Sequence, residues 1–248
     1  RWKMLSRVRE WLFDRFLLPG SFLEETGRKR RGSRSDAGFV IVLAFGRNDY
    51  PDGSFFERLS KEYWDSSSSE TTTIRNVAEW YVEYGTIATF CLLSEAGFDP
   101  GIPNRTLADF CFQEFENNRM PFMLQWEVAY ALWNEYSDWY EENLRHLMAN
   151  WPKREEYLST RDILLEVRDM TRKKGWHNPL IIAHPEHIQR AYFLAKRIYS
   201  DETVRATDLS PSPEWFDRRS VQWWTRGPMQ WLAYEMLARI HHRLKGWL

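Results

Sequence analysis

Residues 39–46 read Phe-Val-Ile-Val-Leu-Ala-Phe-Gly, an uninterrupted apolar run that is rich in β-branched side chains and closed by glycine. This pattern is typical of a strand buried on both faces of a parallel sheet. Two further runs have the same character, at residues 86–94 and 179–183. A polar loop and a segment of helical periodicity follow each run, so the sequence predicts parallel strands joined by right-handed helical crossovers.

The segments between these runs are expected to be helical. The periodicity of apolar residues predicts helices at 55–64, 74–84 and 160–174, and another that runs from the loop at 184–187 to about Tyr199. Residues 105–150 are aromatic and are expected to be helical, with an interruption near Pro121. The predicted fold class is therefore α/β, a Rossmann-like three-layer parallel sheet with an additional Trp-rich helical region.

The composition excludes several classes of protein. The 248 residues suit one domain or two small ones, and 34 basic against 35 acidic side chains argue against general nucleic-acid binding. The two cysteines, Cys91 and Cys111, are too few for a disulfide framework, and both lie in apolar surroundings that predict buried free thiols. No apolar run is long enough to span a bilayer, and residues 1–4 lack the apolar core of a signal peptide. We expect a cytoplasmic protein, with membrane association as the alternative.

Tryptophan is unusually frequent, with 14 residues beside 11 Tyr and 15 Phe. Large aromatic side chains either fill a helical layer or form a surface for a flat ligand, a lipid or a protein partner. Near the C-terminus the apolar stripe of a helix is expected to face the core. The residues of this stripe are Met229, Leu232, Leu237, Ile240 and Leu244. Trp223, Trp224 and Trp231 face either the same core or a membrane or partner.

The first 35 residues have the pattern of an amphipathic helix and a basic linker. Apolar residues recur at three- and four-residue steps over 2–18, Pro19-Gly20 ends the pattern, and residues 28–34 are mostly Arg and Lys. The basic stretch is either a solvated linker or, together with the helix, a peripheral membrane contact through residues 2–34.

Ligands of open parallel sheets bind beyond the carboxyl ends of the strands, so the candidate loops are 46–52, 94–97 and 184–190. None contains a GxGxxG motif or a P-loop. His187 and Arg190 are three residues apart at the start of a helix, where both can face one crevice beside backbone N–H groups that favour an anion. Arg190 suits a phosphate or carboxylate, and His187 suits proton transfer.

Acidic residues beyond the first two strands are candidates for the same site. Asp49 and Asp52 suit a ribose hydroxyl, a proton-accepting role or a solvated turn, and Glu95 ends the second run. Ser94 lacks the Gly-x-Ser-x-Gly elbow of a hydrolase nucleophile. The cluster at 184–187 offers no third metal ligand, so no metal is predicted.

Residues 180–191, Leu-Ile-Ile-Ala-His-Pro-Glu-His-Ile-Gln-Arg-Ala, resemble the signature of the DUF218 family, in which a strand ends in a loop whose His is followed three positions later by Arg-Ala. His187, Arg190 and Ala191 match it. Ser159-Thr160 is similar to the Ser/Thr turn that precedes this strand in the family. Gly46 and residues 94–97 fall where the family has glycine-containing turns, and residues 235–248 are similar to its closing helix.

The resemblance implies a Rossmann-like domain over residues 36–248 with a helical insertion at about 100–155. It also implies a small anionic ligand, either S-adenosylmethionine or a nucleotide-like molecule or a phosphorylated carrier, and transferase or hydrolase chemistry. The alternative is a non-catalytic membrane-peripheral adaptor in envelope or lipid-carrier metabolism. The expected ligand-binding residues are Gly46, Arg47, Asp49, Ser94, Ser159, Thr160, His184 and Arg190. His187 and Glu95 are the expected proton-transfer residues.

Overall fold

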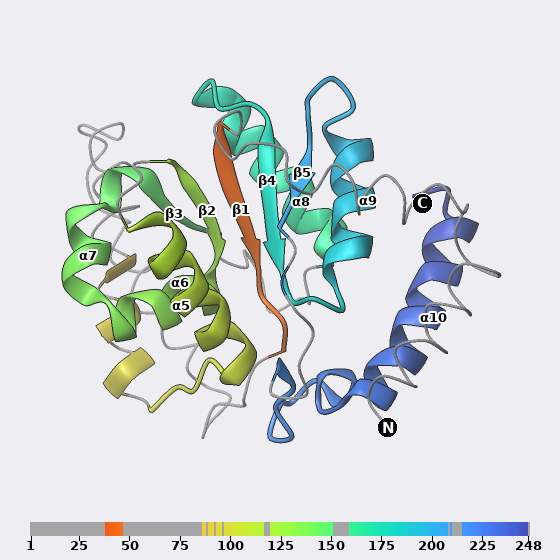
Figure 1. Ribbon diagram of the computed structural model, residues 1–248, viewed down its shortest axis with the longest axis horizontal. Helices are drawn as coiled ribbons and strands as arrows, with labels where there is room; N and C mark the ends of the chain where they lie inside the picture. Colours follow the sequence, from red (N-terminus) through yellow and green to blue (C-terminus); the bar gives the residue numbers. More distant parts are fainter. Residues whose placement is uncertain are drawn as a thin grey trace, which may run out of the picture.

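The computed structural model describes residues 38–46, 86–116 without 88, 92 and 96, 120–150, 159–207, 209 and 215–247. In these residues five parallel strands form one sheet, in the order β3-β2-β1-β4-β5 (Figure 1). The strands are β1 (Phe39–Leu43), β2 (Phe122–Gln125), β3 (Leu147–Asn150), β4 (Pro179–Ala183) and β5 (Arg205–Ala206). The predicted α/β, Rossmann-like fold class is confirmed.

Strand β1 lies at the centre of the sheet and is buried along its whole length. It pairs with β4 from Phe39 opposite Pro179 to Leu43 opposite Ala183, and with β2 on its other side. Alternate side chains of β1 enter two separate hydrophobic clusters. Val40 and Val42 belong to one, and Phe39, Ile41 and Leu43 belong to the other. A strand covered on both faces needs apolar residues at every position, which explains the continuous run.

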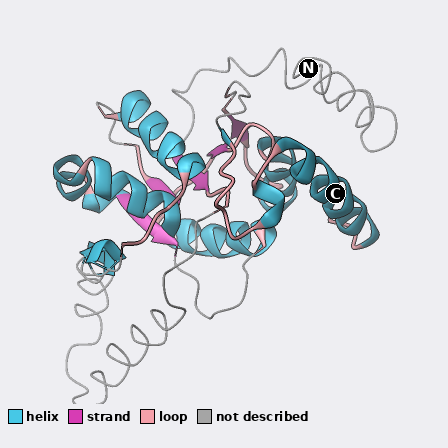
Figure 2. Cartoon of the chain, turned by 90° about the horizontal axis from the view of Figure 1, so that it is seen from below, coloured by secondary structure: helices cyan, strands magenta, loops and turns pink. Residues whose placement is uncertain are grey.

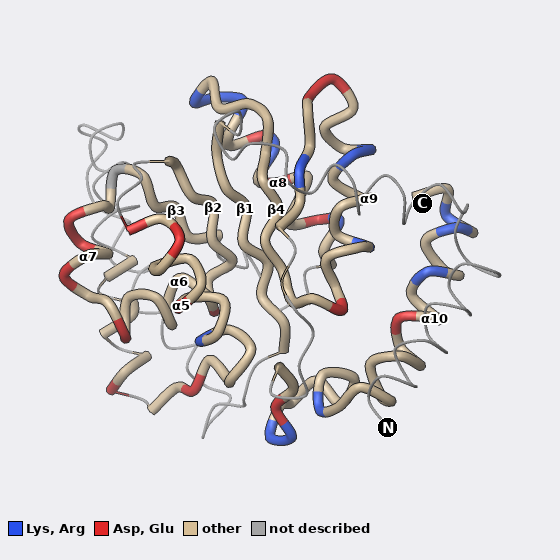
Figure 3. The backbone as a smooth tube through the Cα atoms, viewed as in Figure 1, with Lys and Arg blue, Asp and Glu red and all other residues tan. Residues whose placement is uncertain are grey.

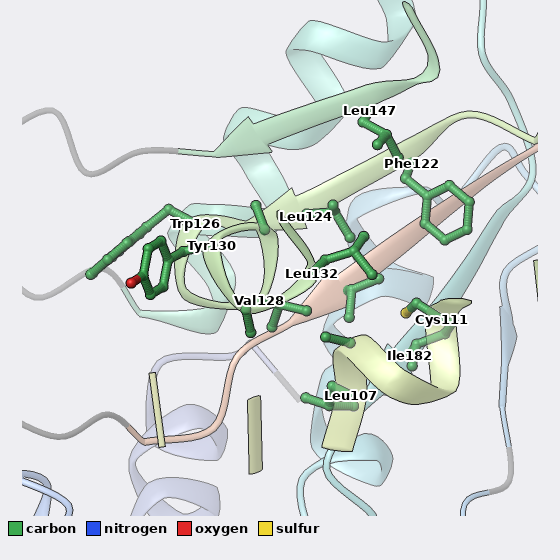
Figure 4. Close-up of a cluster of buried hydrophobic side chains, with 14 of the residues drawn as sticks. Leu107, Cys111, Phe122, Leu124, Trp126, Val128, Tyr130, Leu132, Leu147 and Ile182 are labelled. Carbon is green, nitrogen blue, oxygen red and sulfur yellow. The ribbon is translucent and has the colours of Figure 1, made fainter. Parts of the chain in front are cut away.

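Helices cover both faces of the sheet, as Figure 2 shows from below. α5 (Ile102–Phe115) and α6 (Trp126–Glu135) pack on the face of Val40 and Val42, and Figure 4 shows their side chains in this cluster. The opposite face carries α8 (Thr160–Lys173) and α9 (Ile188–Ile198), both of which agree with the predicted helices. α7 (Ser137–Glu142) follows α6, and α10 (Pro228–Leu244) stands beyond α9 at the side of the molecule (Figure 1).

The expectation that residues 105–150 are helical with an interruption near Pro121 is wrong in part, because this segment supplies two strands of the sheet, the first of which begins directly after Pro121. β2 reads Phe-Met-Leu-Gln and β3 reads Leu-Met-Ala-Asn. Neither contains a β-branched residue, and Met, Leu and Ala favour helices, so local propensity conceals both strands. Pairing with the central strand decides their conformation. The segment expected to be a helical insertion is thus part of the central sheet.

The second predicted strand, at residues 86–94, is also wrong, because the described residues between 86 and 95 are helical. Phe90 and Leu93 are buried on one side of this helix, whereas Cys91 is exposed. A short apolar run fits a buried helix as well as a strand, and periodicity alone does not separate them. Of the two expected buried thiols, only that of Cys111 is buried.

The predicted helices at 2–18, 55–64 and 74–84 and the basic stretch at 28–34 lie outside the described residues. Within the residues that are described, no helix combines the length and the apolar character needed to cross a bilayer.

Gly38 immediately precedes β1 and tolerates no side chain. Its N–H donates to the carbonyl of Asn178 at 3.1 Å, and a Cβ added at Gly38 would lie 2.1 Å from the backbone oxygen of His177. The backbones at the ends of β1 and β4 would have to separate. We therefore expect Gly38→Ala to lower the free energy of unfolding by about 1–3 kcal/mol in urea titrations.

Gly175→Ala is the matched control for this substitution. Gly175 has a φ of 70°, but a Cβ there meets nothing within 4 Å, so only the left-handed backbone opposes alanine. A Gly38→Ala protein as stable as the wild type would contradict the close contact between β1 and the loop before β4.

Candidate functional site

A polar cavity opens at the carboxyl edge of the sheet, where the strand order reverses between β1 and β4. In open α/β sheets this reversal is the usual ligand position. The cavity has a volume of about 50 Å³, enough for a few waters or one small anionic group. Its lining residues come from the ends of β1 and β2, from α8 and α9, and from the chain leading into α10. They are Ala44, Phe45, Gly46, Gln125, Glu127, Thr160, Ile163, His187, Arg190, Gln222, Trp224, Thr225, Trp231 and Tyr234.

The loop after β1 is held in place by two side-chain amides. Gln125 Oε1 accepts a hydrogen bond from the N–H of Ala44 at 3.0 Å. The amide of Asn104, which is fully buried in α5, accepts from Phe45 N at 2.9 Å and donates to Gly46 O at 2.7 Å. These bonds follow the sheet pairing that ends at Leu43 and satisfy the N–H groups of Ala44 and Phe45 and the carbonyl of Gly46.

Gly46 is required at this wall for two reasons. Its φ is 71°, a left-handed conformation that favours glycine, and a Cβ would lie 2.5 Å from Thr225 Oγ1. The chain before α10 therefore approaches the end of β1 so closely that no side chain fits between them.

His187 is the N-cap residue of α9; it lines the cavity and contacts Thr160 at the start of α8. Its Nε2 lies 3.1 Å from Thr160 Oγ1, and its Nδ1 lies 3.3 Å from Arg190 Nη2. Burial, and secondarily the charge of Arg190, lowers the pKa of His187 well below its usual value, so the ring is neutral at pH 7. Because the guanidinium of Arg190 can only donate, Nδ1 of His187 accepts its hydrogen bond. The proton of the neutral ring is therefore on Nε2, which donates to Thr160 Oγ1. The hydroxyl hydrogen of Thr160 is then available to a ligand.

Arg190 belongs to a buried ionic cluster that connects α9 with α10. Its Nε donates to Glu235 Oε2 at 2.9 Å, and Glu235 Oε1 accepts from Arg239 Nε at 2.8 Å. Arg239 also donates to Gln189 Oε1 at 2.7 Å. All three charged side chains are almost completely buried. Since two guanidinium groups share one carboxylate, the cluster presents a net positive charge behind the cavity, where low polarity strengthens its attraction for an anion.

Aromatic rings form the wall opposite the sheet. Trp224 and Tyr234 stack with ring centroids 4.8 Å apart and an angle of 12° between the planes. The guanidinium carbon of Arg190 lies 5.8 Å from the ring centroids of both Trp231 and Tyr234, within the range of a cation–π interaction. These contacts hold the guanidinium at a defined position beside the cavity.

The structure brings together four of the residues predicted for the site, namely Gly46, Thr160, His187 and Arg190. Ser159 is the residue before Thr160 and does not line the cavity; its hydroxyl accepts from the N–H of Asp162 and caps α8.

His184 has a different position from the one expected. It is buried and stacks on Phe45 with centroids 3.6 Å apart, outside the cavity lining. Its Nε2 donates to Trp215 O and its Nδ1 accepts from Glu186 N, both at 3.1 Å. Burial lowers the pKa of His184 to about 3, so the ring is neutral and both of its nitrogens are occupied. In this geometry His184 holds the loop after β4 rather than a ligand.

Ser94 and Glu95 are exposed on the helix at 86–95 and do not line the cavity. That segment is a helix and not a strand of the sheet, so the reason for expecting these two residues at the carboxyl edge does not hold. Arg47, Asp49 and Asp52 lie outside the described residues. Among the residues that are described, no three His, Cys, Asp or Glu side chains are grouped so as to hold a metal ion.

Sequence reasoning missed Asn104, Gln125, Glu127, Trp224 and Tyr234. Gln125 and Glu127 flank the end of β2, so the pattern of a polar residue after a short apolar run is present once 122–125 is recognised as a strand. The other three have no local signal, since their positions depend on how α5 and the chain before α10 pack against the sheet.

Comparison of the chain with protein-family models, with curated proteins and with solved structures finds no match.

Proposed function

We propose that this protein binds a small anionic ligand in the cavity at the carboxyl edge of the sheet. The observation that carries the proposal is the convergence of Thr160, His187 and Arg190, from two helix N-termini, on one polar cavity backed by a net positive charge. Hydrogen-bond donors aimed at one point, with a buried positive charge behind them, suit a phosphate or a carboxylate.

The available donors define how such a group would be bound. Thr160 offers its hydroxyl hydrogen, and the guanidinium of Arg190 uses only Nε and Nη2 in its bonds to Glu235 and His187. In the first turns of α8 and α9, Asp162 N–H donates to Ser159 Oγ and Ile188 N–H donates to His184 O, so only the other first-turn N–H groups can add to these donors. We expect His187 to orient Thr160 and Arg190, because a neutral ring with both nitrogens engaged is a poor general acid.

The cavity of about 50 Å³ is large enough for the anionic group alone, so the rest of a larger ligand would lie outside it. Trp224, Tyr234 and the amide of Gln125 line the cavity and are partly exposed, while Glu127 adds a buried carboxylate to the wall. A nucleotide-like or S-adenosylmethionine-like ligand or a phosphorylated carrier, whose anionic group would enter the cavity, is what the DUF218 resemblance implies. A transferase or hydrolase activity on such a ligand is the reaction class that we propose to test after binding.

Thr160→Val tests the proposal with little change in shape. The wild type is expected to show a higher Tm with at least one member of a panel of inorganic phosphate, nucleotides, S-adenosylmethionine, S-adenosylhomocysteine and isoprenoid phosphates, since a ligand that binds only the folded state stabilises it. Loss of a hydrogen bond to a charged group should weaken binding by about tenfold to a hundredfold in Thr160→Val and in Arg190→Lys. Isothermal titration then gives the affinities.

The matched control is Thr106→Val, which removes an exposed hydroxyl that bonds to Ile102 O on α5. It should bind like the wild type. A panel that produces no shift with the wild type, or shifts that Thr160→Val and Arg190→Lys retain in full, would contradict the proposed site.

A further inference from the structure

α10 buries three polar side chains beside one tryptophan and exposes apolar ones, whereas a helix usually buries its apolar stripe. Its buried residues are Trp231, Glu235, Arg239 and His242. Its exposed apolar residues are Met229, Leu237, Ile240 and Leu244, of which Leu237 is 65% and Leu244 is 83% exposed. Leu232, the fifth residue of the predicted stripe, is half-buried, and for the other four the prediction that the stripe faces the core is wrong. The buried face is selected by the partners of Glu235 and Arg239 on α9.

The four exposed apolar residues form one continuous stripe. At 3.6 residues per turn they fall within about 80° of one another around the helix axis. Trp223, in the 3-10 turn before α10, is a further large apolar side chain that is half exposed. A stripe of this size along a whole helix indicates a surface that another molecule covers.

The charge around the stripe indicates what that molecule is. Glu235 is the single acidic residue between positions 218 and 247, and it is buried between two arginines. Arg226, Arg243 and Lys245 are exposed beside or at the ends of α10, and Figure 3 shows the basic residues along this helix. The covering molecule must therefore combine an apolar layer with negative charge.

Two occupants from the protein itself fit this charge poorly. A second copy would bring one basic α10 against another. Residues 1–18 contain five basic and two acidic side chains, so they too are positively charged. An anionic lipid surface supplies both an apolar layer and negative charge, since an interfacial helix buries its apolar stripe at the acyl boundary and leaves its Lys and Arg at the headgroups.

We infer that α10 lies on the surface of an anionic membrane through Met229, Leu237, Ile240 and Leu244. None of these four residues lines the cavity, so this inference does not depend on the proposed ligand. It also differs from a contact through residues 2–34, because it assigns the contact to the C-terminal helix.

Co-sedimentation of the full chain with phosphatidylcholine vesicles, with and without phosphatidylserine, tests the inference. The wild type should bind the anionic vesicles and be released by high salt. Leu237→Gln with Leu244→Gln should lower the partition coefficient by at least about tenfold, from the lost burial of two leucines. Arg243→Gln with Lys245→Gln should lower it about 25-fold, at about fivefold for each charge.

Matched variants remove the same groups elsewhere on the surface. Ile102→Gln removes another exposed apolar side chain, and Lys173→Gln with Lys174→Gln removes two exposed charges at the end of α8. These controls should bind like the wild type. Failure of the wild type to bind, or equal binding by the α10 variants, overturns the inference. So does concentration-dependent dimerisation that Leu237→Gln abolishes, because it assigns the stripe to a second copy.

Discussion

Glu235→Gln is expected to lower the free energy of unfolding by about 3–5 kcal/mol, the largest effect of any single substitution proposed for this chain. In a protein of this size that corresponds to a fall in Tm of roughly 6–20 °C. The carboxylate of Glu235 is the shared partner of Arg190 and Arg239, and all three side chains are almost completely buried. Without it, two guanidinium groups remain charged in an almost completely buried site with no carboxylate between them.

A second substitution separates this effect from a loss of packing. Arg239→Gln added to Glu235→Gln removes one of the two uncompensated charges, so the double variant should be more stable than Glu235→Gln alone. The exposed pair of Asp201 with Arg172 is the control, and Asp201→Asn should change stability by less than about 1 kcal/mol. If Glu235→Gln were as stable as the wild type in urea titrations, the result would show that α10 does not bury the three charged side chains.

The second large effect is a loss of stability in mild acid. Burial lowers the pKa of His184 from 6.5 to about 3, that of His242 from 6.5 to about 4, and that of His187 in the same direction. Because the folded values lie below 6.5, the unfolded chain takes up these protons first as the pH falls. The contribution of these neutral rings to the free energy of unfolding is fully present above about pH 6.5. It decreases as the pH falls toward their pKa values in the folded protein.

Between pH 7 and pH 5, the low pKa of His184 alone should lower the free energy of unfolding by about 2 kcal/mol, and His187 and His242 should add to this loss. Urea titrations at the two pH values measure the difference. His184→Gln, which can keep a donor and an acceptor in place, should reduce the difference by about 2 kcal/mol. Equal acid sensitivity in wild type and His184→Gln would contradict a neutral buried ring at this position.

The central strands and half of the site follow from local sequence. β1 and β4 are β-branched runs with turn residues after them, and α8 and α9 have strong helical periodicity, so their boundaries are predictable to within three residues. Once β4 and its helix are known, His187 and Arg190 must lie at the carboxyl edge of the sheet. Thr160 was identified only through its family resemblance.

The other half of the site depends on contacts between distant segments. β2 has the composition of a helix, and its strand conformation comes from pairing with β1 some 80 residues earlier in the chain. The helix at 86–95 has the composition of a strand, which is why Glu95 was expected at the site. In both segments the intrinsic preference amounts to a few tenths of a kcal/mol per residue, less than tertiary packing contributes.

The sequence by itself determines that this chain forms a parallel α/β sheet and that His187 and Arg190 meet beyond β4, because both properties rest on short segments whose patterning is unambiguous. Tertiary structure alone decides which face of α10 is buried. The helix has an apolar stripe and a polar one, and the apolar stripe is the face that burial normally selects. Arg190, 45 residues before Glu235, reverses that choice, since a buried guanidinium requires a carboxylate partner and Glu235 lies on the polar stripe.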